Sequence, residues 1–220
     1  MPPRAERLAL VPAVLLIALF SARALRTGDD LYAFLLWNVF LAAIPPGLAL
    51  VAARLHAERA RGATLVALGL WLLFLPNAPY VLTDFVHLRA RAPVPLWYDV
   101  ALLGTASLAG FALGAVSLAR VHAIVRDAIG PRAALATVLA ASLASGYGIY
   151  LGRFVRLNSW DVALHPLAVL ARGVPPFVDP AGQWRAWAVT LVFGALTAAS
   201  YVVHAGLGPA SAATDEPPRK

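Results

Sequence analysis

The sequence contains no cysteine, and this absence excludes several kinds of chemistry. Disulfide bonds, thiolate metal sites and cysteine nucleophiles all require a residue that the chain does not have. Charged residues are also scarce, at 13% of the 220 residues, whereas they make up roughly a quarter of a typical soluble domain. The motifs HExxH and GxSxG and the phosphate-binding P-loop do not occur either, so the sequence shows no signature of the enzyme classes that they mark.

Long uncharged apolar runs take the place of these features. Hydrophobic residues make up 60% of the chain, and most runs approach the roughly 20 residues that cross the hydrocarbon core of a bilayer. The runs lack the alternation of period two that is typical of an outer-membrane barrel. The composition therefore predicts an all-α fold, a polytopic transmembrane helix bundle.

Six membrane spans are expected from these runs. They cover residues 8–25, 31–53, a third span from 63 onward, 100–119, 133–151 and 186–207. Residues 1–208 then form a single transmembrane helical domain. The tail at 209–220 is small, polar and proline-containing, and we expect it to be disordered.

The first span has an alternative interpretation. Residues 4–24 combine two arginines, an apolar run and the small-residue triplet Ala22-Arg23-Ala24, which together resemble a signal peptide with its cleavage site. We favour a retained span, because an arginine inside a cleavage site would be unusual and the apolar run continues to Leu25.

A polar segment interrupts the third span at FLPNAPYVLTDFVHL, residues 74–88. Pro76 and Pro79 lack an amide hydrogen and disfavour helix for the residues before them. We therefore expect Leu75 and Ala78 to be extended and the span to break at Leu75. A break at membrane depth persists only where protein or water covers the unpaired backbone groups.

The helix that resumes after this break is expected to carry several polar groups on one face. Asn77 is placed to cap it. Tyr80 and Asp84 are four residues apart and Asp84 and His87 are three apart, so a phenol, a carboxylate and an imidazole would share one face.

A second polar segment, GYGIYLGRFVRLNSWDVALHPL at residues 146–167, follows the fifth span. Because spans three and five are both odd-numbered, both segments leave the membrane on the same side. Asn158 or Ser159 is expected to cap a short helix with Asp161 in its first turn. The apolar residues at 162–170 are typical of a short helix that lies in the membrane interface, between spans five and six.

A polar site is expected where these segments meet, with a third contribution from PLWYD at the start of span four. The candidate catalytic residues are Asp84, His87 and Asp161, and the candidate binding residues are Asn77, Tyr80, Tyr98, Asp99, Arg153, Arg156, Asn158 and Trp160. The two arginines would bind an anion, since guanidinium forks match phosphate or carboxylate. The spacing of the acidic residues and histidines is too generic to assign metal ligands, and the sequence does not identify a cofactor.

Each candidate also has a simpler structural interpretation. Asn77, Asn158 and Asp99 are good helix caps. Aromatic residues such as Tyr98 and Trp160 suit the belt at a membrane surface. A structural ion pair, for instance between Asp84 and Arg153, remains an alternative to a site, because ionisable groups at a membrane boundary need partners or water.

The blocks WLLFLPNAPYVLTDFVHL, WYD and GYGIYLGRFVRLNSWD resemble the signature blocks of a bacterial family of multi-pass membrane proteins, the domain-of-unknown-function 1361 family. The resemblance covers roughly residues 30–205. It implies a multi-pass architecture and an inner-membrane location, and it implies no reaction.

Three classes of function stay open on this sequence. They are an enzyme or binding protein for a lipid headgroup or cell-envelope precursor, a small transporter with a broken-helix site, and a non-catalytic membrane scaffold. The expected partners are membrane lipids and an anionic small molecule or lipid headgroup. Nucleic acid is not expected, because no basic cluster is interleaved with aromatics.

The orientation in the membrane follows from the positive charges. Ten of the 18 lysines and arginines fall on the side that carries both termini. This bias predicts cytoplasmic termini, and it places the polar site on the non-cytoplasmic face of a bacterial inner membrane.

Overall fold

The structure is a computed structural model that describes residues 4–207, and the tail at 209–220 lies outside the described residues. The described chain is helical and contains no strand, which confirms the all-α bundle. Its longer helices are α1 (Arg4–Thr27), α2 (Ala33–Ala42), α3 (Ile44–Ala57), α4 (Arg61–Phe74), α6 (Leu96–Ala128), α7 (Pro131–Tyr150) and α11 (Trp184–Gly206). The shorter ones are α5 (Asn77–Tyr80), the 3-10 helix η1 (Val81–His87), the π-helical turn η2 (Leu151–Val155), α8 (Asp161–Leu164), α9 (Pro166–Gly173) and α10 (Pro175–Val178).

Six helical stretches of the described chain are long and apolar enough to cross a membrane, as the sequence predicts. They are Ala9–Thr27, Ala33–Ala57, Arg61–His87, Leu96–Ala128, Pro131–Val155 and Trp184–Gly206. The largest difference from the expected bounds is in the fourth span, where α6 has 33 residues. Charged residues such as Asp99 and Arg120 end the apolar run there without ending the helix.

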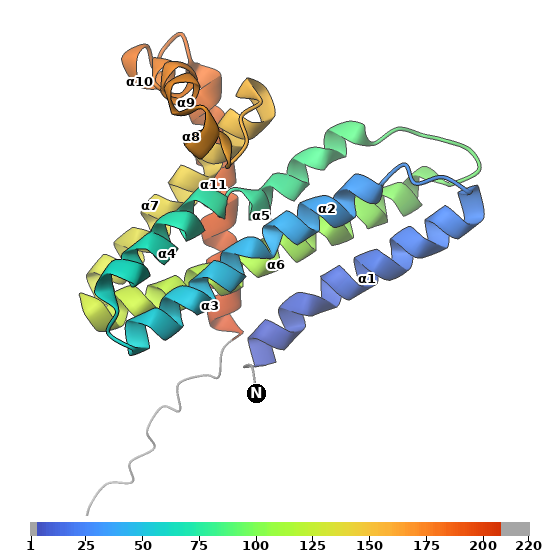
Figure 1. The fold of residues 1–220 in the computed structure, drawn as a ribbon. Helices are drawn as coiled ribbons and strands as arrows, with labels where there is room; N and C mark the ends of the chain where they lie inside the picture. Colours follow the sequence, from blue (N-terminus) through green and yellow to red (C-terminus); the bar gives the residue numbers. More distant parts are fainter. Residues whose placement is uncertain (1–3, 208–220) are drawn as a thin grey trace, which may run out of the picture.

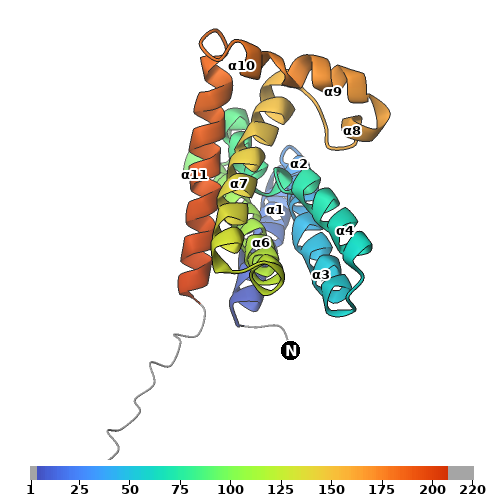
Figure 2. The same cartoon turned by 90° about the vertical axis from the view of Figure 1, so that its left-hand side faces the viewer.

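Helix α6 is the centre of the bundle. In the most apolar stretch of α6, 67% of the residues are buried, whereas the share is 44% or less in each of the other five spans. It packs against α1, α3, α7 and α11. Figure 2 shows α6 with α7 and α11 on one side and α3 with α4 on the other.

The two ends of the bundle carry different connections (Figure 1). In Figure 1 the connections α1–α2 and η1–α6 lie on the right and the connection α7–α11 lies at the top, and together they are called the far end below. The described chain ends and the connections α3–α4 and α6–α7 lie in the lower part of the same view and are called the terminal end. The two polar segments thus emerge at the same end.

The backbone of the third span differs from the expectation. Leu75 is helical, with φ −53° and ψ −38°, and Ala78 lies inside α5. The prediction that both residues become extended is wrong. Helical turns continue through Pro76 and Pro79, with a bond from the Ala78 amide to the Leu75 carbonyl at 3.1 Å in a tighter turn.

Side chains stabilise this irregular stretch by bonding the carbonyls around the prolines. The Asn77 amide donates to the Phe74 carbonyl at 2.9 Å, and the Ser159 hydroxyl donates to the Leu73 carbonyl at 3.2 Å. Asn77 therefore serves the end of α4, and the prediction that it caps the following helix is wrong. Ser159 comes from the second polar segment. The second segment therefore covers and bonds the irregular backbone of the first, as such a stretch at membrane depth requires.

Glycines on two neighbouring helices make room for α5. A Cβ added at Gly110 of α6 would lie under 3.0 Å from the Ala78 carbonyl, and one added at Gly148 of α7 would lie equally close to Pro76. One turn further on, Gly152 faces the ring of Tyr80. These close approaches fix the stretch between α6 and α7.

The α7–α11 connection, residues 156–183, forms three short helices at the far end (Figure 1). The single helix expected over 162–170 is instead split at His165, because Pro166 begins α9. Helix α8 has no side-chain cap, so the prediction that Asn158 or Ser159 caps it is wrong. Large apolar side chains are exposed along the connection, which agrees with a position in the membrane interface.

Candidate functional site

A cavity of about 240 Å³ lies at the far end, where the two polar segments meet. Its walls come from α2, from residues 73–80, from the end of α7 with η2, and from the α7–α11 connection. Its hydrogen-bonding side chains are Trp37, Asn38, Asn77, Tyr80, Asn158, Ser159 and Trp160. The structure thus brings together four of the candidate binding residues, with Asn77 donating to Ser159 at 3.3 Å across the two segments.

Asp84 lies directly behind this wall. Its side chain is 1% exposed, and its carboxylate accepts a hydrogen bond from the Asn38 amide at 2.7 Å. Among the described residues this is its one hydrogen bond, and no ion pair reaches it. Asn38 therefore links a buried carboxylate to the cavity.

Arg153 lies behind the opposite part of the wall, on η2. Its guanidinium donates to the Tyr80 hydroxyl at 3.4 Å and stands 6.0 Å from the centre of the Tyr80 ring. The ion pairs found in the described chain do not include one between Asp84 and Arg153. The two charges approach the cavity through Asn38 and Tyr80 instead.

The three candidate catalytic residues do not converge. His87 is exposed, and its ring packs edge-on against Phe34. The carboxylate of Asp161 accepts the backbone N–H of Asn158 at 2.6 Å and so orders the connection. The described residues contain no group of three or more histidine or acidic side chains arranged to hold a metal ion.

Arg156 is also separate from the cavity. It is exposed and follows η2 in the left-handed conformation, with φ 63°. This conformation is uncommon outside glycine and turns the chain out of the helix. Of the two arginines expected to bind an anion, only Arg153 contacts a cavity residue.

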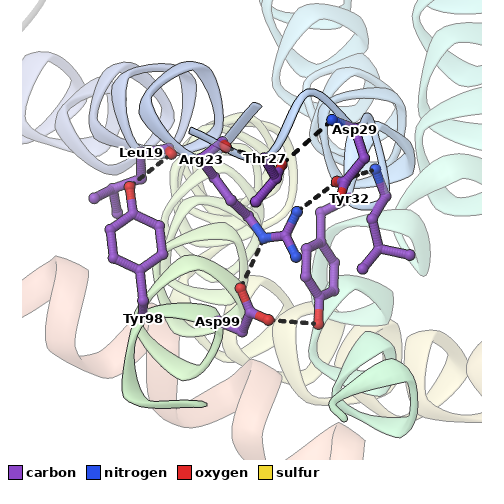
Figure 3. A network of polar contacts seen from close by, with 8 residues as sticks. Leu19, Arg23, Thr27, Asp29, Tyr32, Tyr98 and Asp99 are labelled. Atoms are coloured by element: carbon purple, nitrogen blue, oxygen red, sulfur yellow. Dashed lines mark hydrogen bonds and ion pairs between the residues drawn. The ribbon is translucent and has the colours of Figure 1, made fainter. Parts of the chain in front are cut away.

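Tyr98 and Asp99 belong to a second polar cluster, which Figure 3 shows. Asp99 is 0% exposed and accepts a hydrogen bond from the Arg23 guanidinium at 2.9 Å. The Tyr32 hydroxyl donates to the other oxygen of Asp99 at 3.4 Å. The Tyr98 hydroxyl donates to the Leu19 carbonyl of α1 at 2.8 Å. This cluster joins α1 and the start of α2 to α6, and Tyr98 and Asp99 do not line the cavity.

The cluster ends in the exposed carboxylate of Asp29, in the connection between α1 and α2. Arg23 also pairs with Asp29 in the α1–α2 connection at 2.6 Å. The backbone N–H of Leu31 and the Arg23 guanidinium hold the pKa of Asp29 below its usual value. Arg23 thus has a carboxylate partner on each side.

Sequence reasoning missed Asn38, Arg23 and Tyr32. An arginine and an asparagine inside apolar spans are signals in themselves, because buried polar groups in a membrane need partners. Their partners lie 46 residues away for Asn38 and 76 for Arg23, so no local spacing identifies the pairs.

Five apolar helical stretches surround the central helix α6, and the length and composition of all six indicate an α-helical membrane protein. The model of the family described as "Protein of unknown function (DUF1361)" matches residues 37–199. The match covers well over half of the chain, so the chain belongs to this family. It includes every residue that lines the cavity and leaves out α1. Comparisons with curated proteins and with solved structures gave no match.

Proposed function

We propose that the far-end cavity binds the polar head of a lipid or of a cell-envelope precursor. The observation that carries this proposal is the placement of Asp84. A buried carboxyl group at membrane depth is costly unless its oxygens have hydrogen-bond or charged partners, and within residues 4–207 the one hydrogen-bond partner of Asp84 is the neutral Asn38, which lines the cavity. Asp99, at the same end, has its arginine in contact. A ligand that donates hydrogen bonds near Asn38 would supply the further polar partner that the carboxyl group of Asp84 lacks.

The lining supports an amphiphilic ligand. Amide, hydroxyl, phenol and indole groups face a small volume, as recognition of a headgroup requires. Trp37 and Val162 line the same cavity and are exposed at the bundle surface. An apolar chain attached to the bound headgroup has a route past these two residues into the bilayer.

The charges behind the wall favour a headgroup that combines an anion with donors. Arg153 polarises Tyr80 on one side, which suits a phosphate. Asp84 polarises Asn38 on the other side, which suits a hydroxyl or an amine. With both termini in the cytoplasm, this site faces outward from the inner membrane.

The test is to identify lipids that co-purify with the protein by native mass spectrometry. The variants are Asn38→Leu, Asp84→Asn and Trp160→Ala, and the control is Trp184→Ala, an exposed tryptophan at the same end that does not line the cavity. We expect each cavity variant to retain several-fold less of one amphiphile than the wild type and the control do. Equal retention by all five proteins would refute the proposal.

Transport is a second candidate, because irregular helices flank the cavity on two sides. The stretch around Pro76 and the π-helical turn η2 both contribute lining residues. Paired discontinuous helices are typical of transport sites. A cysteine at Asn158 separates the two functions: labelling from the far side alone indicates a binding site, and labelling from both sides indicates transport.

A further inference from the structure

A second and larger cavity, of about 610 Å³, lies at the terminal end, away from the proposed headgroup site. It is formed by the α3–α4 connection and the end of α6, which Figure 1 shows at the lower left. Leu65, Leu68, Ile124 and Ile129 give it apolar walls. Neither the candidate site nor the cluster around Asp99 reaches it.

The rim of this cavity has a net positive charge. Arg59 and Arg61 both line it, and within residues 4–207 neither guanidinium has a hydrogen-bond or ion-pair partner. One carboxylate, Asp127, also stands on the rim, but it is paired with His56 at 2.8 Å. That pair bridges α3 and α6 and closes one edge. The two unpartnered arginines, which are two residues apart, are therefore available to bind an anion.

The walls of the cavity continue onto the lipid-facing surface. Leu65 is 70% exposed and Ile129 is 76% exposed, and both lie beside the rim. A soluble anion would leave these walls uncovered, whereas an acyl chain would cover them. The arginines and the apolar walls together therefore favour a single ligand that has a negatively charged head and a hydrocarbon tail.

We propose that this terminal-end cavity binds an anionic phospholipid, with its phosphate between Arg59 and Arg61 and an acyl chain along Leu65 and Ile129. Guanidinium groups suit phosphate oxygens, and basic sites between transmembrane helices suit anionic lipids. The site is independent of the far-end cavity. Its occupancy would tie the α3–α4 connection to the end of α6.

The experiment measures bound lipid by native mass spectrometry after exchange into detergent with equal amounts of phosphatidylglycerol and phosphatidylcholine. We expect the wild type to retain about fivefold more phosphatidylglycerol or better. The double variant Arg59→Gln/Arg61→Gln should lose this preference. The control Arg54→Gln/Arg132→Gln removes two exposed arginines at the same end that do not line the cavity, and it should keep the preference.

Three results would overturn the proposal. The first is equal retention of both lipids by the wild type, which does not depend on the folding of any variant. The second is an equal loss in both double variants, which would show general surface attraction. The third is displacement of phosphatidylglycerol by millimolar inorganic phosphate, which would show that a soluble anion is the ligand.

Discussion

Asp84 and Asp99 are both buried carboxylates at the far end, and their partners are the reason why we propose a structural role for Asp99 and a binding role for Asp84. Asp99 contacts Arg23 and Tyr32, so its charge is compensated within the protein. Asp84 contacts the neutral amide of Asn38. A residue type alone therefore does not mark a site, because the difference lies in the partners.

Gly110 gives a prediction at the same scale. A Cβ at this position overlaps the Ala78 carbonyl, so Gly110→Ala has to push α5 away from α6. We expect a loss of about 1–3 kcal/mol in the free energy of unfolding in detergent. The control is Gly104→Ala in the same helix, where a Cβ meets nothing within 4 Å. It should be neutral or stabilise by up to about 1 kcal/mol, because alanine favours helix. Equal effects of the two changes would contradict the close packing of α5.

At the scale of elements, α1 is attached to the bundle by a buried ion pair. Arg23 is 3% exposed and lies between Asp29 and Asp99. Cleavage at the triplet around Arg23 would leave Asp99 without its cation. We therefore predict that α1 is retained as a span.

The ion pair predicts how substitutions combine. Arg23→Met leaves Asp99 buried and uncompensated, and we expect a cost of about 3–5 kcal/mol in unfolding experiments in detergent. The double variant Arg23→Met/Asp99→Leu removes both charges and should recover most of the loss. Arg26→Met, at an exposed position of α1, is the control and should change stability little. A double variant no more stable than Arg23→Met would argue against the pair.

The elements also show what the sequence could predict. Run length predicts six spans, since each must cover the bilayer core, and odd numbering predicts that the two polar segments share an end. The helical path through Pro76 and Pro79 could not be predicted. It depends on the Ser159 hydroxyl, which reaches the Leu73 carbonyl from 86 residues away. The sequence predicts part of the candidate site and misses the rest for a similar reason. Asn77 and Asn158 lie in the two polar segments, which stand out in the sequence, whereas Asn38 is a single asparagine in an apolar span.

At the scale of the whole molecule, the six-span topology predicts which positions share a side of the membrane. Single cysteines can be introduced without background, because the natural chain has none. We expect cysteines at Arg89 and Arg172 to react with an impermeant reagent from one side, and cysteines at Arg59 and Arg126 from the other. Permeabilising the membrane should make all four react. Labelling of Arg89 and Arg172 from opposite sides would rule out the shared far end.

The length of α6 has a consequence for the bilayer itself. Between Asp99 and Arg120 the helix has an uncharged stretch, Val100–Ala119, of about 30 Å at 1.5 Å per residue. This length equals the hydrocarbon thickness of a typical membrane. The uncharged stretch is therefore just long enough to cross that thickness, and the last turns of α6 beyond Arg120 would extend past the hydrocarbon. Where the membrane is thinner or thicker than this stretch, lipids around the bundle must compress or extend their chains, so the protein is matched to one hydrophobic thickness.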